Sequence, residues 1–159
     1  MMRLRDAMSR SVMARDTAES VGQLHGAVVD AATKRIVGLQ VGKGHKARVA
    51  DWSSITGVGP DAAVVDTAAS LRSANGEREE RMVKGDIALL GGRVLSDRGD
   101  VLGALDDLEF DEETGAIEAL VCGGATIPAH RLRAVGGYAV VVAAEPATAG
   151  EPSGALGTA

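Results

Sequence analysis

Residues 21–42 read VGQLHGAVVDAATKRIVGLQVG, and residues 102–123 read LGALDDLEFDEETGAIEALVCG. The two stretches align without a gap at an offset of 81 positions. The matched pairs are Gly22 and Gly103, Leu24 and Leu105, Asp30 and Asp111, Thr33 and Thr114, Ile36 and Ile117, Leu39 and Leu120, and Gly42 and Gly123. An ungapped repeat of this kind predicts two copies of one fold, so a feature that the fold requires should be present in both.

Both copies are rich in short β-strand signals. Runs weighted toward β-branched and aliphatic residues, such as IVGLQV at 36–41 and YAVVVAA at 138–144, alternate with glycines. No long segment has the 3.6-residue period of a helix. The sequence therefore predicts an all-β chain of two tandem small closed barrels, joined by a charged linker, with little helix.

The segment DEETG, residues 111–115, is predicted to be a hairpin loop. The Asp111 side chain can accept hydrogen bonds from loop amides, and Gly115 can adopt the positive φ of a bulged turn. The first copy has Lys34 at the position of Gly115, which costs conformational energy if the same left-handed geometry is kept.

A second set of matches follows at an offset of 77 positions, and it pairs Ile55 with Leu132, Val58 with Val135, and Gly59 with Gly136. The offset falls because the first copy has a longer loop, KGHKAR, at residues 43–48. Next to that loop the alignment places Ala50 opposite Pro128 and Trp52 opposite His130.

The predicted domains are repeat 1 at residues 1–70, a charged linker at 71–84, repeat 2 at 85–145 and a disordered tail at 146–159, which is rich in Ala, Gly, Pro and Ser. The linker contains the turn signal Asn75-Gly76 and a stretch of helical character, EREERM. Units of this size bury only about 60% of their unfolded surface. We therefore expect the copies to pack on each other or on a partner.

Residues 94–142, VLSDRGDVLGALDDLEFDEETGAIEALVCGGATIPAHRLRAVGGYAVVV, resemble the PRC-barrel family. That family includes the cytoplasmic domain of the photosynthetic reaction-centre H subunit and the C-terminal domain of a ribosome-maturation factor. The shared pattern is a D-x-x-T-G hairpin, an apolar strand, an I-P pair and a Gly turn before a valine-rich strand. The first copy is similar but looser. The resemblance implies two PRC-type barrels, and it transfers function poorly because the family is functionally diverse.

The charge of the chain is unevenly distributed. The formal net charge is −5, and the split between the halves is +3 for residues 1–75 and −8 for residues 76–159. The acidic balance argues against DNA and against general nucleic-acid binding. The asymmetry predicts one basic and one acidic face, which either pack in a complementary way or are simply solvated.

A basic loop contains Lys43, His45, Lys46 and Arg48. Such a loop can hold phosphate, an RNA backbone or anionic lipid headgroups, and the alternative is a solvated loop. Trp52 flanks it and is either a partner anchor or a core residue. The loop also fits the dinucleotide-binding pattern G-x-G-x-x-A, but the extended residues that follow cannot supply the helix that this chemistry needs.

An acidic stretch contains Asp106, Asp107 and Glu109 and continues into the hairpin. These carboxylates are either a binding surface for a basic partner or solvated side chains. A calcium loop starting at Asp107 would need glycine where Glu112 stands, so the EF-hand pattern fails.

Catalytic and metal-binding patterns are lacking, so we expect no enzyme activity, no cofactor and no metal. His25, His45 and His130 are scattered, and Cys122, the only cysteine, matches Val41 and is expected to be a small buried residue. A lone cysteine fits a reducing setting. The first residues lack the apolar core of a signal peptide, and no stretch is long and apolar enough to span a membrane, so a cytoplasmic location is expected.

The sequence thus favours a non-enzymatic module for protein–protein interaction or self-association. Two alternatives stay open. One is an RNA- or ribosome-assembly-associated factor, weakened by the scarcity of aromatic stacking residues. The other is a peripheral component of a membrane-associated complex of the photosynthetic type, which follows from the resemblance alone.

Overall fold

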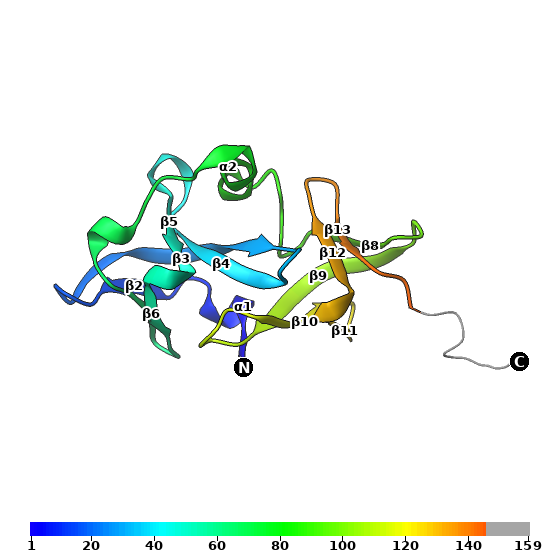
Figure 1. Ribbon diagram of the computed structural model, residues 1–159, viewed down its shortest axis with the longest axis horizontal. Helices are drawn as coiled ribbons and strands as arrows, with labels where there is room; N and C mark the ends of the chain where they lie inside the picture. The colour runs from blue at the N-terminus through cyan, green and yellow to red at the C-terminus, as the bar shows by residue number, and fades with distance from the viewer. Residues whose placement is uncertain (146–159) are drawn as a thin grey trace, which may run out of the picture.

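The computed structural model describes residues 1–145, which form two β-sheets, one from each repeat (Figure 1). The all-β prediction is confirmed for this part of the chain. The predicted tail lies outside the described residues.

The first sheet is built from six strands, β2 (Ser11–Ala14), β3 (Glu19–Asp30), β4 (Arg35–Val41), β5 (Arg48–Asp51), β6 (Ile55–Val58) and β7 (Ala62–Val65). Their order across the sheet is β5-β4-β3-β2-β7-β6. The β2 and β7 pair is parallel, and the other neighbours are antiparallel.

The second sheet repeats this topology with β8 (Arg93–Ser96), β9 (Val101–Phe110), β10 (Ile117–Cys122), β11 (Ala125–Pro128), β12 (Leu132–Val135) and β13 (Val140–Val142). The order is β11-β10-β9-β8-β13-β12, again with one parallel pair, β8 and β13. One strand has no counterpart, because β1 (Met2–Arg3) from the chain start pairs with β9. Apart from β1, the two sheets have the same strand order, as the sequence repeat predicts.

Neither sheet is joined into a ring by strand pairing among residues 1–145. The strands β5 and β6 end the first path, and β11 and β12 end the second. The closed barrels that the sequence predicts are therefore not confirmed. In each sheet one long strand pairs with one neighbour along its first part and with another neighbour along its second part. In the first sheet, β3 pairs with β2 over residues 19–23 and with β4 over residues 24–30.

The matched glycines Gly22 and Gly103 lie where the long strand changes partners. Their φ angles are +145° and +136°. A Cβ on Gly22 would come within 2.8 Å of a Val41 methyl group, and one on Gly103 within 3.3 Å of the Cys122 sulfur. Cys122 is buried, as expected from its match to Val41. The crossover thus requires glycine in both copies.

The predicted hairpin at residues 111–115 is confirmed, and the first copy forms the same turn. Asp111 accepts hydrogen bonds from the amides of Glu113 (2.8 Å) and Thr114 (3.3 Å), and Gly115 has a φ of +78°. Lys34 keeps the left-handed geometry, with a φ of +56°. The first copy therefore carries the conformational strain that the second avoids.

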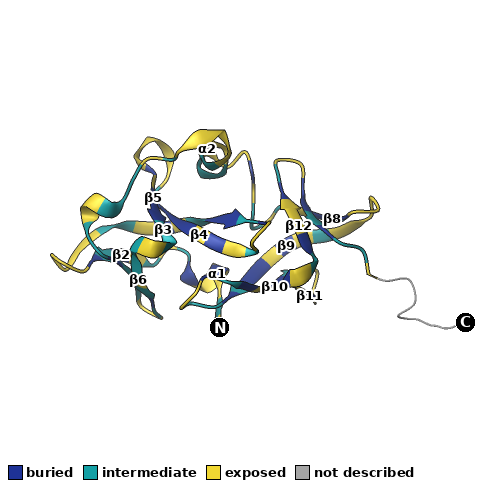
Figure 2. Cartoon of the chain, viewed as in Figure 1, coloured by how far each residue is buried: buried dark blue, intermediate teal, exposed yellow. Residues whose placement is uncertain are grey.

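The two hairpins join the sheets to each other. The Ile36 amide donates to the Gly115 carbonyl (2.7 Å), and the Ile117 amide donates to the Lys34 carbonyl (2.9 Å). Each bond maps onto the other under the repeat offset, so the contact has approximate two-fold symmetry. One hydrophobic cluster runs through both repeats, and Figure 2 shows buried positions along the strands of both sheets.

The pairing of β4 with β5 corrects the alignment next to the basic loop. Ala50 pairs with Leu39, and in the second copy Ile127 pairs with the matched Leu120. Ala50 is therefore equivalent to Ile127, not to Pro128. The sequence placed two apolar residues opposite the I-P pair, but Asp51 occupies the proline position, and Trp52 corresponds to Ala129 and not to His130.

The linker forms a helix, α2 (Gly76–Lys84), which is more regular than the predicted helical character. It ends at Gly85, whose φ of +89° is left-handed and whose amide donates to the carbonyls of Arg81 and Met82. The other α-helix of residues 1–145 is a single turn, α1 (Leu4–Ala7), directly after β1. Neither has the length and apolar character needed to cross a membrane.

Candidate functional site

The candidate site lies at the edge of the long strand β3 that faces away from β4, and the equivalent edge of β9 faces away from β10. On β9 this side is occupied by the chain's own N-terminal segment. Met2 pairs with Phe110, and Arg3 pairs with Glu109. Leu4 follows at the start of α1 and is 1% exposed. The segment therefore adds a short strand to β9 and then inserts an apolar anchor into the shared core.

The predicted acidic residues hold this segment in place. Asp107, 7% exposed, accepts hydrogen bonds from the amides of Arg5 (2.9 Å) and Leu108 (2.8 Å). Glu109 forms an ion pair with Arg3 at 3.0 Å. Asp106 is exposed, and its carbonyl accepts from Arg5 Nε at 2.8 Å. The predicted surface for a basic partner thus binds a basic segment of the same chain.

Arg3 and Arg5 were missed as binding residues by the sequence reasoning. The sequence feature that pointed to them was the opposite net charge of the two halves of the chain. Complementary packing was one of the two interpretations of that asymmetry, and solvation was the other. The Arg3 guanidinium binds the Glu109 carboxylate. The Arg5 guanidinium donates to the Asp106 backbone carbonyl, and the Arg5 amide donates to the Asp107 carboxylate.

On β3 the equivalent side carries no strand. The residues matched to Glu109 and Phe110 are Val28 and Val29, and both belong to strand pairs with β4 only. Within residues 1–145 no backbone hydrogen bond joins residues 25–29 to any segment other than β4. The segment that would correspond to β1 is the end of α2, which is helical and stops at Gly85.

A cavity of about 340 Å³ opens along this side of β3, and we call it the β3 groove. Its apolar lining comes from the strand, from α2 and the residues after it, from the N-terminal segment and from β12, and it includes Leu4, Met8, Ala27, Val29, Met82, Ile87, Leu89, Leu90 and Val135. Its polar lining is His25, Gln40, Lys43 and Lys84. The volume falls in the range of ligand pockets, about 300–1,000 Å³.

Gln40 lies in the β3 groove and is 5% exposed. Its Nε2 donates to the carbonyls of Gly42 (3.0 Å) and Val83 (3.4 Å), which fixes the orientation of the amide. Its Oε1 faces Gly26 and accepts no hydrogen bond from residues 1–145. A buried acceptor without a donor costs about 1–3 kcal/mol, so this oxygen marks a place for a donor.

Of the basic side chains in the loop, only that of Lys43 reaches the β3 groove, together with Gly44. Lys43 lines it, whereas His45, Lys46 and Arg48 are exposed and do not. The loop forms a one-turn 3-10 helix, Gly44–Lys46, and leads directly into β5. No α-helix directly follows the glycines, so the loop lacks the helix N-terminus that dinucleotide binding requires. This agrees with the extended residues predicted from the sequence.

Trp52 lies in the interface between the repeats and not in the β3 groove. Its ring meets Phe110 edge to face, with centroids 6.3 Å apart, and its Nε1 donates to the Glu113 carbonyl at 3.4 Å. It is half-buried against the common core. Of its two predicted roles, these contacts are those of a packing residue.

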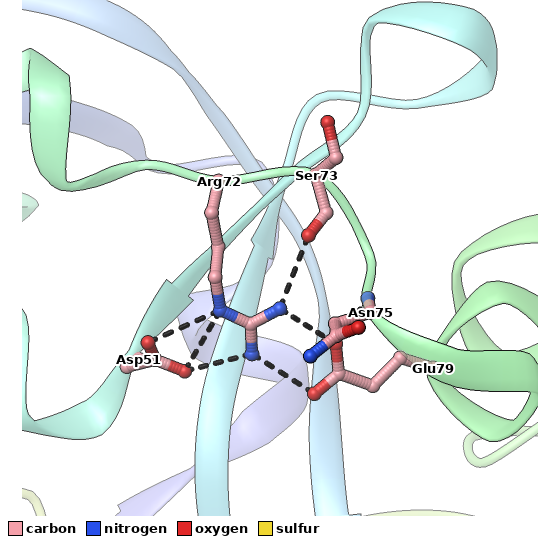
Figure 3. A network of polar contacts seen from close by, with 5 residues as sticks. All are labelled: Asp51, Arg72, Ser73, Asn75 and Glu79. Atoms are coloured by element: carbon pink, nitrogen blue, oxygen red, sulfur yellow. Dashed lines mark hydrogen bonds and ion pairs between the residues drawn. The ribbon is translucent and has the colours of Figure 1, made fainter.

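An ion-pair network fixes α2 beside the first sheet (Figure 3). Arg72 binds Asp51 at 2.8 Å and Glu79 at 2.7 Å, and the Glu79 carboxylate also accepts from the Asn75 amide at 2.8 Å. The hydrogen bonds from Arg72 hold the pKa of both carboxyls below their ordinary values. Because α2 forms one side of the β3 groove, this network positions that side. The sequence reasoning missed it, since no local pattern relates a linker arginine to a strand-end aspartate.

No group of three or more His, Cys, Asp or Glu side chains suited to a metal ion occurs within residues 1–145. The chain matches no protein-family model, and no curated protein is significantly similar to it.

Proposed function

We propose that the protein is a non-enzymatic interaction module made of two PRC-barrel-like repeats, and that the β3 groove binds a protein partner. The strand order shared by the two sheets supports the tandem repeat, and the D-x-x-T-G hairpin with its left-handed fifth residue supports the likeness to PRC barrels. The proposed role is that of an adaptor.

The observation that carries the proposal is the difference between two equivalent strand edges. On β9 the edge is filled by residues 2–3. On β3 the matched residues Val28 and Val29 are buried but, within residues 1–145, pair with no strand other than β4, and the more exposed residues 25–27 beside them border an apolar cavity. Unpaired strand edges are templates for another chain, and adding a strand to a sheet edge is a common mode of protein recognition. The described fold therefore has one long strand whose second edge is paired with a strand and one whose second edge is not.

A pair of tryptophan variants tests the proposal in the native cell. Ala88 is exposed and lines the β3 groove, so Ala88→Trp should block it. Ala134 is exposed on β12 and does not line it, so Ala134→Trp is the matched control. Quantitative affinity purification of the full chain should recover a protein partner with wild type and Ala134→Trp and lose it with Ala88→Trp. A partner set unchanged by Ala88→Trp would contradict the proposal.

A further inference from the structure

We propose that the partner segment in the β3 groove is an extended peptide in which apolar residues alternate with Asp or Glu, and that it adds as a strand to the free edge of β3. This inference rests on the proposed function and names the chemistry of the partner.

The extended conformation follows from the other repeat. On β9, residues 2–3 pair antiparallel with Glu109 and Phe110, directly beside the β9–β10 ladder. Val28 and Val29 hold the matched positions beside the β3–β4 ladder. The long strands have the same partners in the same order. Val28 and Val29 are 5% and 2% exposed, so a peptide adds first at the adjoining residues 25–27, which are unpaired on this side, are more exposed and line the groove.

A peptide also supplies the donor that Gln40 lacks. Gln40 Oε1 is buried, lines the groove and accepts no hydrogen bond within residues 1–145. It faces Gly26, where a Cβ would come within 3.2 Å of it. With no side chain on Gly26, the oxygen stays open to an approaching donor. Every residue of a peptide except proline carries a backbone N–H, so an extended segment can satisfy it.

The charge of the groove selects an acidic segment. No Asp or Glu lines it, while Lys43 and Lys84 do. The contrast with β9 is position by position, because Asp106 corresponds to His25, Asp107 to Gly26 and Glu109 to Val28. The β9 edge attracts arginines and the β3 edge attracts carboxylates. The basic N-terminal segment of a second copy is therefore the wrong occupant for the β3 groove.

The apolar lining accounts for the alternation. Successive side chains of a strand point to opposite faces. A peptide on the edge of β3 therefore directs every second residue toward the apolar lining that includes Val29, Met82 and Ile87. The residues between them face away from that lining, where lysine side chains on the rim can reach acidic groups.

Two labelled peptides test this chemistry by fluorescence anisotropy with the full chain, SVEVDVEVS and its basic counterpart SVKVKVKVS. The acidic peptide should bind saturably, and the basic one at least about tenfold more weakly. Replacing Lys43→Glu together with Lys84→Glu should reverse this preference. Lys46→Glu is the matched control, since Lys46 lies in the same loop but does not line the groove, and it should leave the preference unchanged. Equal binding of both peptides, or equal effects of the two sets of variants, would overturn the inference.

Backbone methylation tests whether the peptide adds as a strand. Alternate amides of an edge strand point toward its neighbour. N-methylation of one alternate set in the acidic peptide should therefore weaken binding about tenfold, and methylation of the other set should have little effect. Equal tolerance of both sets would show that no ladder forms. Octanoate serves as a third probe, and its binding with no binding of either peptide would identify a small-carboxylate pocket and overturn the inference.

The outcomes also separate the inference from the proposed function. If the acidic peptide fails to bind while Ala88→Trp still abolishes partner capture, the peptide chemistry is wrong and the interaction module stands. If partner capture is also insensitive to Ala88→Trp, the proposed function fails as well.

Discussion

Trp52 packs directly on Gly115, so that a Cβ on Gly115 would come within 3.0 Å of the indole ring and 2.8 Å of the Ile36 carbonyl oxygen. A single tryptophan of the first repeat thereby requires a glycine in the hairpin of the second. The same glycine also has the left-handed φ of the turn.

Gly115→Ala should destabilise the protein more than its backbone angle alone requires. A left-handed φ costs an L-residue about 1–2 kcal/mol, and the contacts with Trp52 and Ile36 should add at least about 1 kcal/mol. Gly99→Ala is the matched control, because Gly99 has a φ of +94° but open space around its Cβ. Urea denaturation of both variants measures the difference, and equal losses would contradict the packing role of Trp52.

Lys34→Gly should stabilise the protein, because Lys34 keeps the left-handed conformation that glycine adopts without strain. The expected gain is up to about 1 kcal/mol after the entropy cost of glycine is subtracted. Ala32→Gly, in the same exposed turn but without a positive φ, should instead lose stability. Thermal unfolding followed by circular dichroism checks both, and a lower melting temperature for Lys34→Gly would show that the strain is absent in solution.

Arg72→Gln should change how stability depends on acid. The folded pKa values of Asp51 and Glu79 lie below their ordinary values of 3.8 and 4.5 because Arg72 donates hydrogen bonds to both. A lowered folded-state pKa contributes stability that is present above the unfolded value and is lost as pH falls through the folded value. Wild type should therefore lose stability below about pH 4.5 more steeply than Arg72→Gln.

The size of this effect at neutral pH is limited by exposure. The network is partly open to solvent, so Arg72→Gln should cost only about 1 kcal/mol at pH 7. Urea midpoints between pH 3 and pH 7 give the comparison, with Arg15→Gln as the control because its ion pair with Asp66 is long (3.6 Å) and exposed. Parallel acid curves for wild type and Arg72→Gln would refute the coupling.

Leu4→Ala should destabilise both repeats together. Leu4 comes from the first repeat, but its segment is bound to β9 and its side chain belongs to the common core. Removing a buried leucine typically costs about 2–5 kcal/mol. Hydrogen exchange should speed up in β3 and β9 alike, whereas Val101→Ala, at a position 64% exposed, should have little effect. Loss of protection confined to one sheet would mean that the repeats unfold independently.

Cys122 should react slowly with thiol reagents in the folded protein. Burial raises the pKa of its thiol, and a thiolate is needed for reaction. Labelling should become faster in denaturant and with rising pH. Gly103→Ala should also accelerate it, because the new Cβ would lie 3.3 Å from the sulfur at a φ of +136°. Rapid labelling of native wild type at neutral pH would contradict the buried position.

The parts of the fold that the sequence predicted are those set by local chemistry repeated in both copies. Gly22 and Gly103 match at the repeat offset because neither crossover has room for a side chain. Asp111 and Gly115 specify a hairpin within five residues. The role of β1 could not be predicted, because a strand of two residues has no periodicity and its partner lies more than 100 residues away. Only the excess of arginine near the start and of carboxylate on β9 pointed to it.

The candidate site was predicted only in part, for a related reason. Lys43 was singled out because it lies in a dense basic loop, and it does line the β3 groove. Gln40 and Lys84 were not, since a single buried amide and a lysine at a helix end have no distinctive neighbours in sequence. Trp52 was aligned with the wrong residue because the first copy has no proline to mark the I-P pair. Asp51, which binds Arg72, stands at the proline position.

The paired bonds between the hairpins have a consequence for how the molecule is organised. Ile36 with Gly115 and Ile117 with Lys34 form an isologous contact, in which each repeat presents the same patch to the other. The chain is in this sense a homodimer held in one polypeptide. Two identical subunits would necessarily have identical strand edges. In a single polypeptide the two repeats can differ in sequence. The β9 edge can therefore hold the N-terminal segment, while the β3 edge can acquire a different role in binding.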